Sequence, residues 1–137
     1  MAAITVTAGS VVPGSDANVA TGFAGATITA GQVLYIDTAN SNVLKLAQCD
    51  GTALEATVAG IALNGASSGQ VVNYIKGGTV TIGGTTVAGT MYGVGTTAGD
   101  IIPHADIATT NKVSYVGYAT TTGILSVQIN NTGITKA

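Results

Sequence analysis

His104 is the only histidine in the chain and the side chain best suited to proton transfer or metal binding. Asp106 lies two positions after it and Asp100 four positions before it. A hydrolytic triad needs a histidine beside a serine or cysteine and a carboxylate, whereas a metal site needs further strong ligands. The sequence offers neither arrangement, and Pro103 directly before the histidine is typical of a turn. We therefore interpret His104 as a solvated loop residue.

The cysteine and the carboxylates give no stronger indication of catalysis. Cys49 is the only cysteine, and the charge of the neighbouring Asp50 disfavours the thiolate form. The six acidic residues are scattered along the chain, whereas glycoside hydrolysis needs two carboxyl groups about 5–10 Å apart across a sugar. Such sites usually carry aromatic platforms, and the chain has no Trp. We predict that the protein is not an enzyme and has no catalytic, metal-binding or cofactor-binding residue.

Residues 93–98, GVGTTA, match the G-x-G-x-x-A form of the dinucleotide-binding fingerprint. That motif binds a pyrophosphate only when its last position begins a helix, whose N-terminus then faces the ligand. Here Gly99 follows directly and Pro103 comes four residues later, so no helix of useful length fits. We interpret the match as a chance occurrence in a glycine-rich chain.

The composition excludes several classes of partner. Four Lys, no Arg and six acidic residues leave no cationic surface for nucleic acid. No apolar run is long enough to span a membrane, and residues 1–5, MAAIT, lack the basic and apolar regions of a signal peptide. With a single cysteine, these features fit synthesis in a reducing cytoplasm. An exterior with so few charges is unusual for a freely diffusing protein and favours a structural role in an assembly.

The composition of the chain favours β-strands as the elements that position any binding surface. The chain holds 22 Thr, 15 Val and 12 Ile, all β-branched, against six Leu, and 20 Gly divide it into short segments. Residues 33–36, VLYI, are apolar on both faces, which predicts a central strand. Strands are expected at 33–36, 43–46, 58–63, 71–75, 79–82, 91–94, 113–119 and 125–130, and the candidates for a short helix are 51–57 and 103–110. We predict an all-β fold, a small compact β-barrel or sandwich.

Residues 1–26 differ from the rest of the chain. They are mostly Ala, Gly, Ser, Thr and Asn, and Asp16 is their only charged side chain. We interpret them as an extended N-terminal arm, followed by a β-rich body at 27–131 and a short C-terminal tail at 132–137. Because the alternating strand patterns begin only in the body, removing residues 1–22 is expected to leave the body folded.

The order of the segments in the body carries a family resemblance. A strand ending in Tyr-x-Asp precedes a Val-Ala-Gly-Ile-Ala strand, a Gly-Thr-Val strand, an Ala-Gly-Thr-x-Tyr turn and a late Gly-Tyr-Ala strand. The segments that match best are 30–37 (AGQVLYID), 44–47 (LKLA), 58–64 (VAGIALN), 69–71 (GQV), 78–83 (GTVTIG) and 125–129 (LSVQI). Over residues 27–131 the chain resembles the small capsid cement, or head decoration, proteins of tailed bacteriophages.

The resemblance implies a barrel-like, β-tulip-like body that binds the outside of the mature phage head after expansion. Proteins of this family sit at three-fold or quasi-three-fold positions and clamp neighbouring capsid subunits. The resemblance therefore implies that the partner is the major capsid protein, that the chain forms a homotrimer on the shell and that it lies on the capsid exterior. The family shares no active-site residues that could be transferred to this chain. Arms in this family often reach onto the shell. The apolar anchors of this arm are expected to be Ile4, Val6, Val11, Val12 and Phe23.

Two other functions suit a β-rich chain of this size. One is a tail or fibre adhesin domain that binds the host surface, which should show an exposed aromatic or acidic ligand site. The other is a small glycan-active enzyme, which needs two neighbouring carboxylates. The sequence shows neither feature. A structural protein of the virion, with no nucleic-acid or membrane partner, is therefore the leading prediction.

Overall fold

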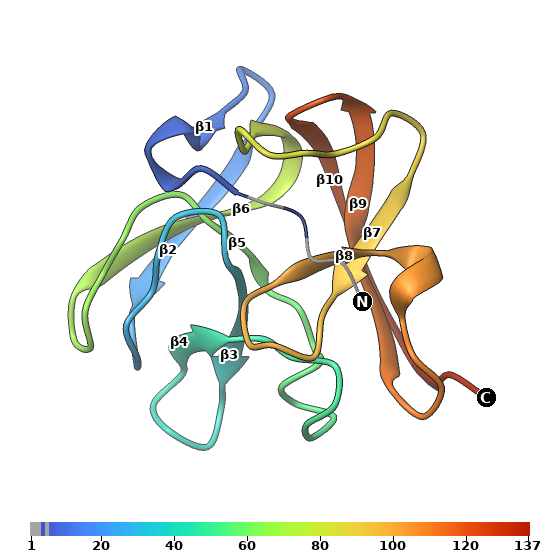
Figure 1. Cartoon of the computed structure of the whole chain (residues 1–137). Helices are drawn as coiled ribbons and strands as arrows, with labels where there is room; N and C mark the ends of the chain where they lie inside the picture. The colour runs from blue at the N-terminus through green and yellow to red at the C-terminus, as the bar shows by residue number, and fades with distance from the viewer. Residues whose placement is uncertain (1–3, 5) are drawn as a thin grey trace.

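The structure, a computed structural model, describes residue 4 and residues 6–137 (Figure 1). Within this part of the chain there is no α-helix, and the regular elements are strands and two short 3-10 turns. In chain order they are η1 (Ala8–Ser10), β1 (Val12–Pro13), β2 (Asn18–Phe23), β3 (Val33–Asp37), β4 (Val43–Leu46), β5 (Gly60–Ala62), β6 (Val71–Thr81), β7 (Met91–Val94), β8 (Ile101–Pro103), η2 (His104–Asp106), β9 (Lys112–Thr121) and β10 (Ile124–Thr135). The predicted all-β fold is confirmed.

The strands belong to one antiparallel sheet that curls strongly, like half of a barrel (Figure 1). They lie in the order β4-β3-β5-β6-β10-β9-β7-β8, and β1 and β2 pair with β6 outside this path. β6 therefore joins two groups of strands, because its first part pairs with β2 and β5 and its second part with β1 and β10. An isolated bridge between Ala24 and Leu44 brings the chain just after β2 onto β4.

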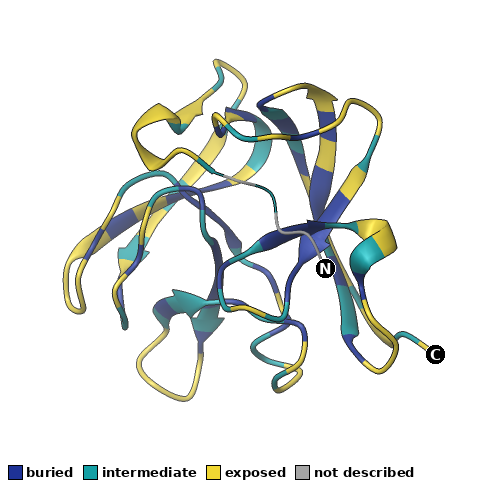
Figure 2. Ribbon diagram, viewed as in Figure 1, coloured by how far each residue is buried: buried dark blue, intermediate teal, exposed yellow. Residues whose placement is uncertain are grey.

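Two clusters of buried side chains fill the curled sheet. The larger takes side chains from β3 and from β5 to β10, and the smaller lies among β3, β4, β5 and β6. β3 serves both clusters, because Val33 and Tyr35 belong to the larger and Leu34 to the smaller. The predicted central strand at 33–36 is thus confirmed. In Figure 2 the buried residues lie along the strands, where they alternate with exposed ones, and the loops at the rim are largely exposed.

Most of the other predicted strands are confirmed. Those at 43–46 and 91–94 are β4 and β7 with the same bounds, and the remainder overlap β5, β6, β9 and β10. The strands expected at 71–75 and 79–82 form the single strand β6, because the glycines between them do not make a turn. Gly78 has a φ of +88°, and a Cβ there would overlap the carbonyl oxygen of Asp16, which passes close by.

Three further sequence-based expectations differ from the structure. The helix candidate at 51–57 is a series of turns and bends, and the candidate at 103–110 contains only η2. Most of the expected tail at 132–137 is instead the end of β10, which continues to Thr135 through its ladder with β9, and only residues 136–137 follow the strand. β8 is not among the expected strands. It is only three residues long, which is too short to show an alternating pattern in the sequence.

The segment expected to be an extended arm is part of the folded sheet. Residues 1–3 and 5 of it lie outside the described residues. β1 and β2 both pair with the same edge of β6 along most of its length. That edge supplies the backbone hydrogen-bond partners that the segment lacks by itself. The sheet therefore has no break at residue 26.

Candidate functional site

Three of the five predicted anchors face the inside of the molecule. Ile4, Val6 and Val11 are partly buried and pack against the larger core cluster. Burial of side chains of this size removes apolar surface from water and stabilises the fold. These three residues are therefore part of the structure of the body, and in this conformation a partner cannot reach much of their surface.

Backbone hydrogen bonds fasten residues 4 and 6–11 to the body of the sheet. The N–H of Ile4 donates to the carbonyl of Ile101 in β8, at 2.9 Å. The N–H of Thr7 donates to the carbonyl of Ile82, directly after β6, at 3.1 Å. Both bonds reach the group of strands that pairs with the second part of β6, and Figure 1 shows the chain leading from the region of β8 towards β1.

Gly31 makes room for the side chain of Val6. Its φ is +92°, a conformation that residues with a side chain rarely adopt. A Cβ at this position would overlap Cγ1 of Val6. Glycine therefore serves both the backbone conformation and the close approach of the N-terminal segment.

The other two predicted anchors, Val12 and Phe23, lie on the outside. Val12 is 56% exposed in β1. Phe23, the only phenylalanine in the chain, is 59% exposed at the end of β2. It lies directly opposite Val71 of β6, which is 50% exposed. The structure therefore separates the five predicted anchors into an inner group of three and an outer group of two.

Phe23 belongs to a group of exposed uncharged side chains on paired strands, which we call the outer β2–β6 face. It consists of Val19, Thr21 and Phe23 of β2 and Val71 and Asn73 of β6, all exposed. The exposed Lys76 lies at the edge of this face, opposite the register shift between Asn18 and Val19. Thr21 lies opposite Asn73, and its hydroxyl donates to the side-chain oxygen of Asn73 at 2.8 Å. Apolar side chains thus lie on both sides of a polar pair whose members are hydrogen-bonded to each other.

Asp16 fixes the turn that leads into β2. Its carboxylate accepts hydrogen bonds from the backbone N–H of Thr79 at 3.1 Å and from the Thr79 hydroxyl at 2.7 Å. The hydrogen bonds from Thr79 lower the pKa of Asp16 below its ordinary value, because they favour the charged form. The β1–β2 turn is thereby held against β6, which positions the outer β2–β6 face.

The residues that suggested catalysis are not assembled into an active site. His104 Nδ1 lies 2.7 Å from the hydroxyl of Tyr115 on the exposed side of the molecule. Among the described residues, no three His, Cys, Asp or Glu side chains group together as a metal site would require. Cys49 is buried, and burial together with the charge of Asp50 raises the pKa of its thiol. A raised pKa disfavours the nucleophilic thiolate.

Several carboxylates serve local structure. Asp37 forms an ion pair with Lys45 at 2.8 Å, and this hydrogen bond raises the pKa of Lys45. Glu55 accepts a hydrogen bond from the backbone N–H of Thr52 at 2.9 Å, which closes a turn. Burial raises the pKa of Asp100, which lies in the turn before β8. Asp37, Glu55 and Asp100 thus lie in separate local surroundings, as their spacing in the sequence predicts.

Residues 93–98 lie at the end of β7 and in the turn that leads to β8. β7 and β8 pair with each other as an antiparallel hairpin. The motif is therefore followed by a strand and presents no helix N-terminus to a phosphate. The expectation that no helix follows residues 93–98 is confirmed.

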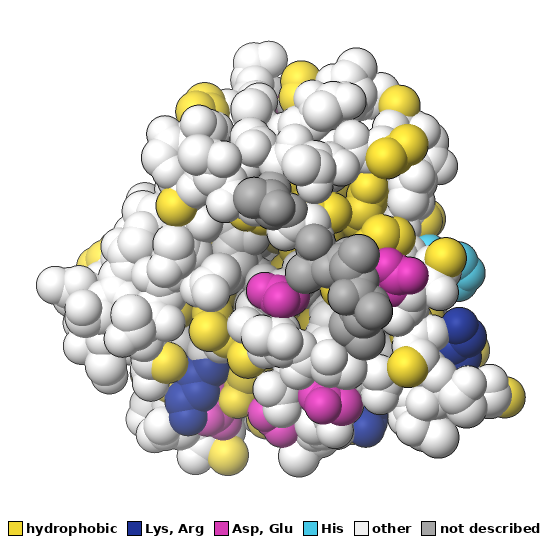
Figure 3. All heavy atoms as spheres, viewed as in Figure 1, with side chains coloured by type: hydrophobic (Ala, Val, Ile, Leu, Met, Phe, Trp, Pro, Cys, Tyr) yellow, Lys and Arg dark blue, Asp and Glu magenta, His cyan; other side chains and the backbone are white. Residues whose placement is uncertain are grey.

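The surface carries charge unevenly. On the face shown in Figure 3, Lys, Asp and Glu side chains lie in the middle and lower parts. The upper part, where β1 and one end of β10 lie, shows only apolar and uncharged polar atoms. The low charge of the sequence thus leaves whole regions of the surface without a charged side chain.

Comparison of the chain with protein-family models, with curated proteins and with solved structures finds no match. Within the described residues, no helix combines the length and apolar character needed to cross a membrane. The outer β2–β6 face is the strongest candidate binding surface, because it combines exposed apolar side chains with a backbone fixed by pairing.

Proposed function

We propose that the chain is a capsid cement protein that binds the outer surface of the mature head of a tailed bacteriophage. In this role it clamps neighbouring subunits of the major capsid protein. The observation that carries the proposal is the outer β2–β6 face, where Phe23 and Val71 are exposed opposite each other on paired strands. The resemblance of residues 27–131 to head decoration proteins supports the same function.

The physical properties of this face suit docking. Burying a side chain of the size of Val or Phe contributes about 1.5–3 kcal/mol. The strands are already held by their ladder, so binding orders few additional groups. A shell also presents many equivalent sites close together, which raises the effective concentration of each contact. Modest single contacts are therefore sufficient for stable decoration.

The same proposal places the protein on the capsid exterior after synthesis in the host cytoplasm. We expect a homotrimer at three-fold or quasi-three-fold positions of the shell, formed on the lattice from chains that are monomeric in dilute solution. With four Lys and six acidic residues in the whole chain, ionic contacts contribute little. Binding should therefore persist near 1 M salt, where the Debye length is about 3 Å.

Cosedimentation with purified phage heads tests the proposal. The wild-type protein should sediment with mature, expanded heads and remain in the supernatant with unexpanded proheads. The double variant Phe23→Ala/Val71→Ala should lose most of this binding. Ile134→Ala is a matched control, because Ile134 is 62% exposed on β10 and lies outside the outer β2–β6 face.

Two results would count against the proposal. One is wild-type protein that stays in the supernatant with mature heads. The other is a double variant that binds heads as well as the wild type, which would remove the outer β2–β6 face from the interface. Binding to host cells in place of heads would favour the adhesin alternative.

A further inference from the structure

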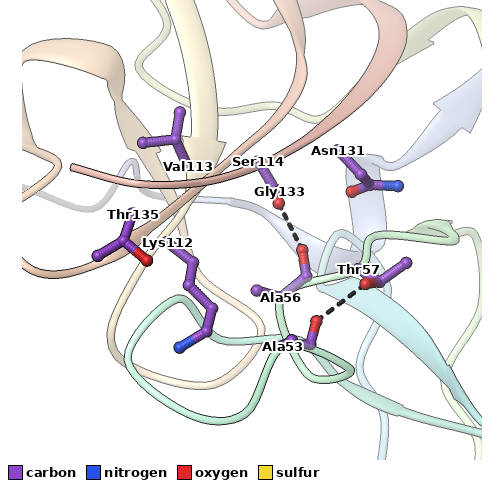
Figure 4. Close-up of a pocket in the computed structure, with 9 residues that line it drawn as sticks. All are labelled: Ala53, Ala56, Thr57, Lys112, Val113, Ser114, Asn131, Gly133 and Thr135. Carbon is purple, nitrogen blue, oxygen red and sulfur yellow. Dashed lines mark hydrogen bonds between the residues drawn. The ribbon is translucent and has the colours of Figure 1, made fainter.

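A surface pocket of about 170 Å³ lies between the loop at 51–57 and the paired ends of β9 and β10 (Figure 4). Ala53, Ala56 and Val113 give it apolar walls. Lys112 and Thr135, which are paired in the β9–β10 ladder, contribute polar groups to the same pocket. The pocket therefore combines an apolar interior with one cationic side chain.

Hydrogen bonds between side chains and the backbone fix this pocket in place. The Ser114 hydroxyl donates to the carbonyl of Ala56, as Figure 4 shows. The side-chain amide of Asn131 accepts from the N–H of Val58 at 2.8 Å and donates to its carbonyl at 3.2 Å. These hydrogen bonds fasten the loop to both strands and fix the walls of the pocket. Pre-formed pockets of this kind bind small molecules with little cost in ordering.

β10 is irregular where it lines the pocket. Its register against β9 shifts between Asn131 and Ile134. Such irregularities redirect side chains and are frequent beside binding sites. Here the shift falls between two residues that line the pocket, Asn131 and Thr135, and Gly133 lines it as well.

The ammonium group of Lys112 has a backbone carbonyl as its hydrogen-bond partner and, within the described part of the chain, no carboxylate. Its Nζ donates to the carbonyl of Gly51 at 2.7 Å, and an ammonium group carries three donors. Among the described residues no carboxylate lies within ion-pair distance of it, whereas Lys45 is paired with Asp37. Lys112 is half-buried, and charged groups removed from water are normally paired with an opposite charge. Lys112 therefore has no ion-pair partner among the described residues, although the carboxylate of Glu55 lies in the same turn as the Gly51 carbonyl that it contacts.

We propose that this pocket binds a small aliphatic carboxylate. The carboxylate accepts a hydrogen bond from Lys112 Nζ, and a chain of about three carbons lies against Ala56 and Val113. The size fits, because an engineered cavity of about 150 Å³ in another protein holds benzene, and butyrate has the same number of non-hydrogen atoms. The Thr135 hydroxyl points towards the Lys112 side chain and is a second donor (Figure 4). This inference does not rest on the proposed function.

Titration of the ¹⁵N-labelled full-length protein with sodium butyrate, followed by NMR at constant ionic strength, tests the inference. Saturable shifts are expected at the amides of residues 53–57 and 112–114. Butyramide, which has the same shape without the charge, should give no saturable shift. Blocked glutamate, N-acetylglutamate α-amide, carries the same carboxylate on a peptide unit. Saturation by both acids identifies a pocket that also accepts a protein side chain, and saturation by butyrate alone identifies a site for free acids.

Two variants locate the site. Lys112→Met should weaken butyrate binding by at least about tenfold, because a charge-assisted hydrogen bond is lost. Lys136→Met is the matched control, because Lys136 also donates to a backbone carbonyl, that of Ile107, but does not line the pocket. Ala53→Leu keeps the lysine and fills the pocket, so it should also weaken binding and covers the case in which Lys112→Met fails to fold.

The inference is overturned by any of three results. Shifts that rise linearly without saturating show non-specific association. Equal saturation by butyramide shows that the cation plays no part. Unchanged butyrate binding in Lys112→Met or in Ala53→Leu shows that the acid binds elsewhere.

Discussion

The inner and outer groups of apolar side chains in the N-terminal part of the chain have opposite surroundings. Ile4, Val6 and Val11 pack against the larger core cluster, whereas Val12 and Phe23 face solvent. Both groups contain ordinary aliphatic or aromatic residues, so residue type alone does not show which side chains hold the fold together. The difference lies in the neighbours, which are core residues for the inner group and exposed strand residues for the outer group. The inner group should therefore govern stability and the outer group binding.

Removing residues 1–22 should have the largest effect on stability. Contrary to the expectation from sequence, we expect the shortened chain to lose cooperative unfolding, because β6 loses its pairing with β1 and most of β2. The core loses the inner group at the same time. Thermal melting followed by far-UV circular dichroism, with NMR amide dispersion, measures this. A dispersed spectrum and a cooperative melt would show that 27–131 is an independent body.

Gly31→Ala tests the packing of Val6 against position 31 by a smaller change than truncation. We expect it to lower the free energy of unfolding by about 3 kcal/mol, because a positive φ costs roughly 1–2 kcal/mol and the overlap with Val6 adds overpacking. Gly69→Ala is the matched control. Gly69 has a φ of +88° with no neighbouring atom within 4 Å of a Cβ.

The Gly69→Ala control should cost only about 1 kcal/mol, the part due to backbone conformation. Urea unfolding of the two variants gives both values. An equal loss of unfolding free energy in the two variants would mean that Val6 does not pack closely against position 31. That result would contradict the assignment of Val6 to the core.

The body of the sheet could be predicted from sequence, but its N-terminal strands could not. Residues 33–36 and 43–46 show clear strand patterns and became β3 and β4. In β2 the large side chains, Val19 and Phe23, face outwards, while Ala20 and Gly22 are the less exposed positions. A rule that places large apolar residues inside therefore misreads this strand. The edge of β6 that accepts it cannot be identified from local sequence.

The candidate sites were predictable only in part. Phe23 was identified by its size, but its neighbour Val71 is 48 residues away and meets it only through the β2–β6 ladder. The carboxylate pocket could not be predicted, because Ala56 and Lys112 come from distant parts of the chain. No local motif signals such a pocket. Its parts are common residue types, and their meaning comes from the pairing of β9 with β10.

The dependence of stability on pH should show two small effects of opposite sign. The pKa of Asp16 is lowered from 3.8, so its contribution is present above that value and is lost as pH falls through the lowered pKa. Asp16→Asn should therefore destabilise the protein at neutral pH and matter less in acid. Urea unfolding at several pH values measures the difference. A deficit in Asp16→Asn that stays constant into acid would contradict the role of the Thr79 hydrogen bonds.

Asp100 provides the opposite case. Burial raises its pKa from 3.8, so the folded state favours the protonated form and is penalised once pH rises through the raised pKa. Asp100→Asn should be slightly more stable than the wild type at neutral pH. This advantage should disappear as pH falls below the ordinary value. An Asp100→Asn variant that is less stable at neutral pH would mean that the carboxylate has a favourable partner.

The division between the inner and outer groups is tested most directly by comparing Val6→Ala with Phe23→Ala, with unfolding free energy and binding to mature heads measured on the same preparations. We expect Val6→Ala to lower the unfolding free energy by about 1 kcal/mol and to keep wild-type binding. Phe23→Ala should change the unfolding free energy by less than about 0.5 kcal/mol and weaken binding at least about tenfold. The reverse pattern, with Phe23→Ala unstable and Val6→Ala unable to bind, would contradict the account.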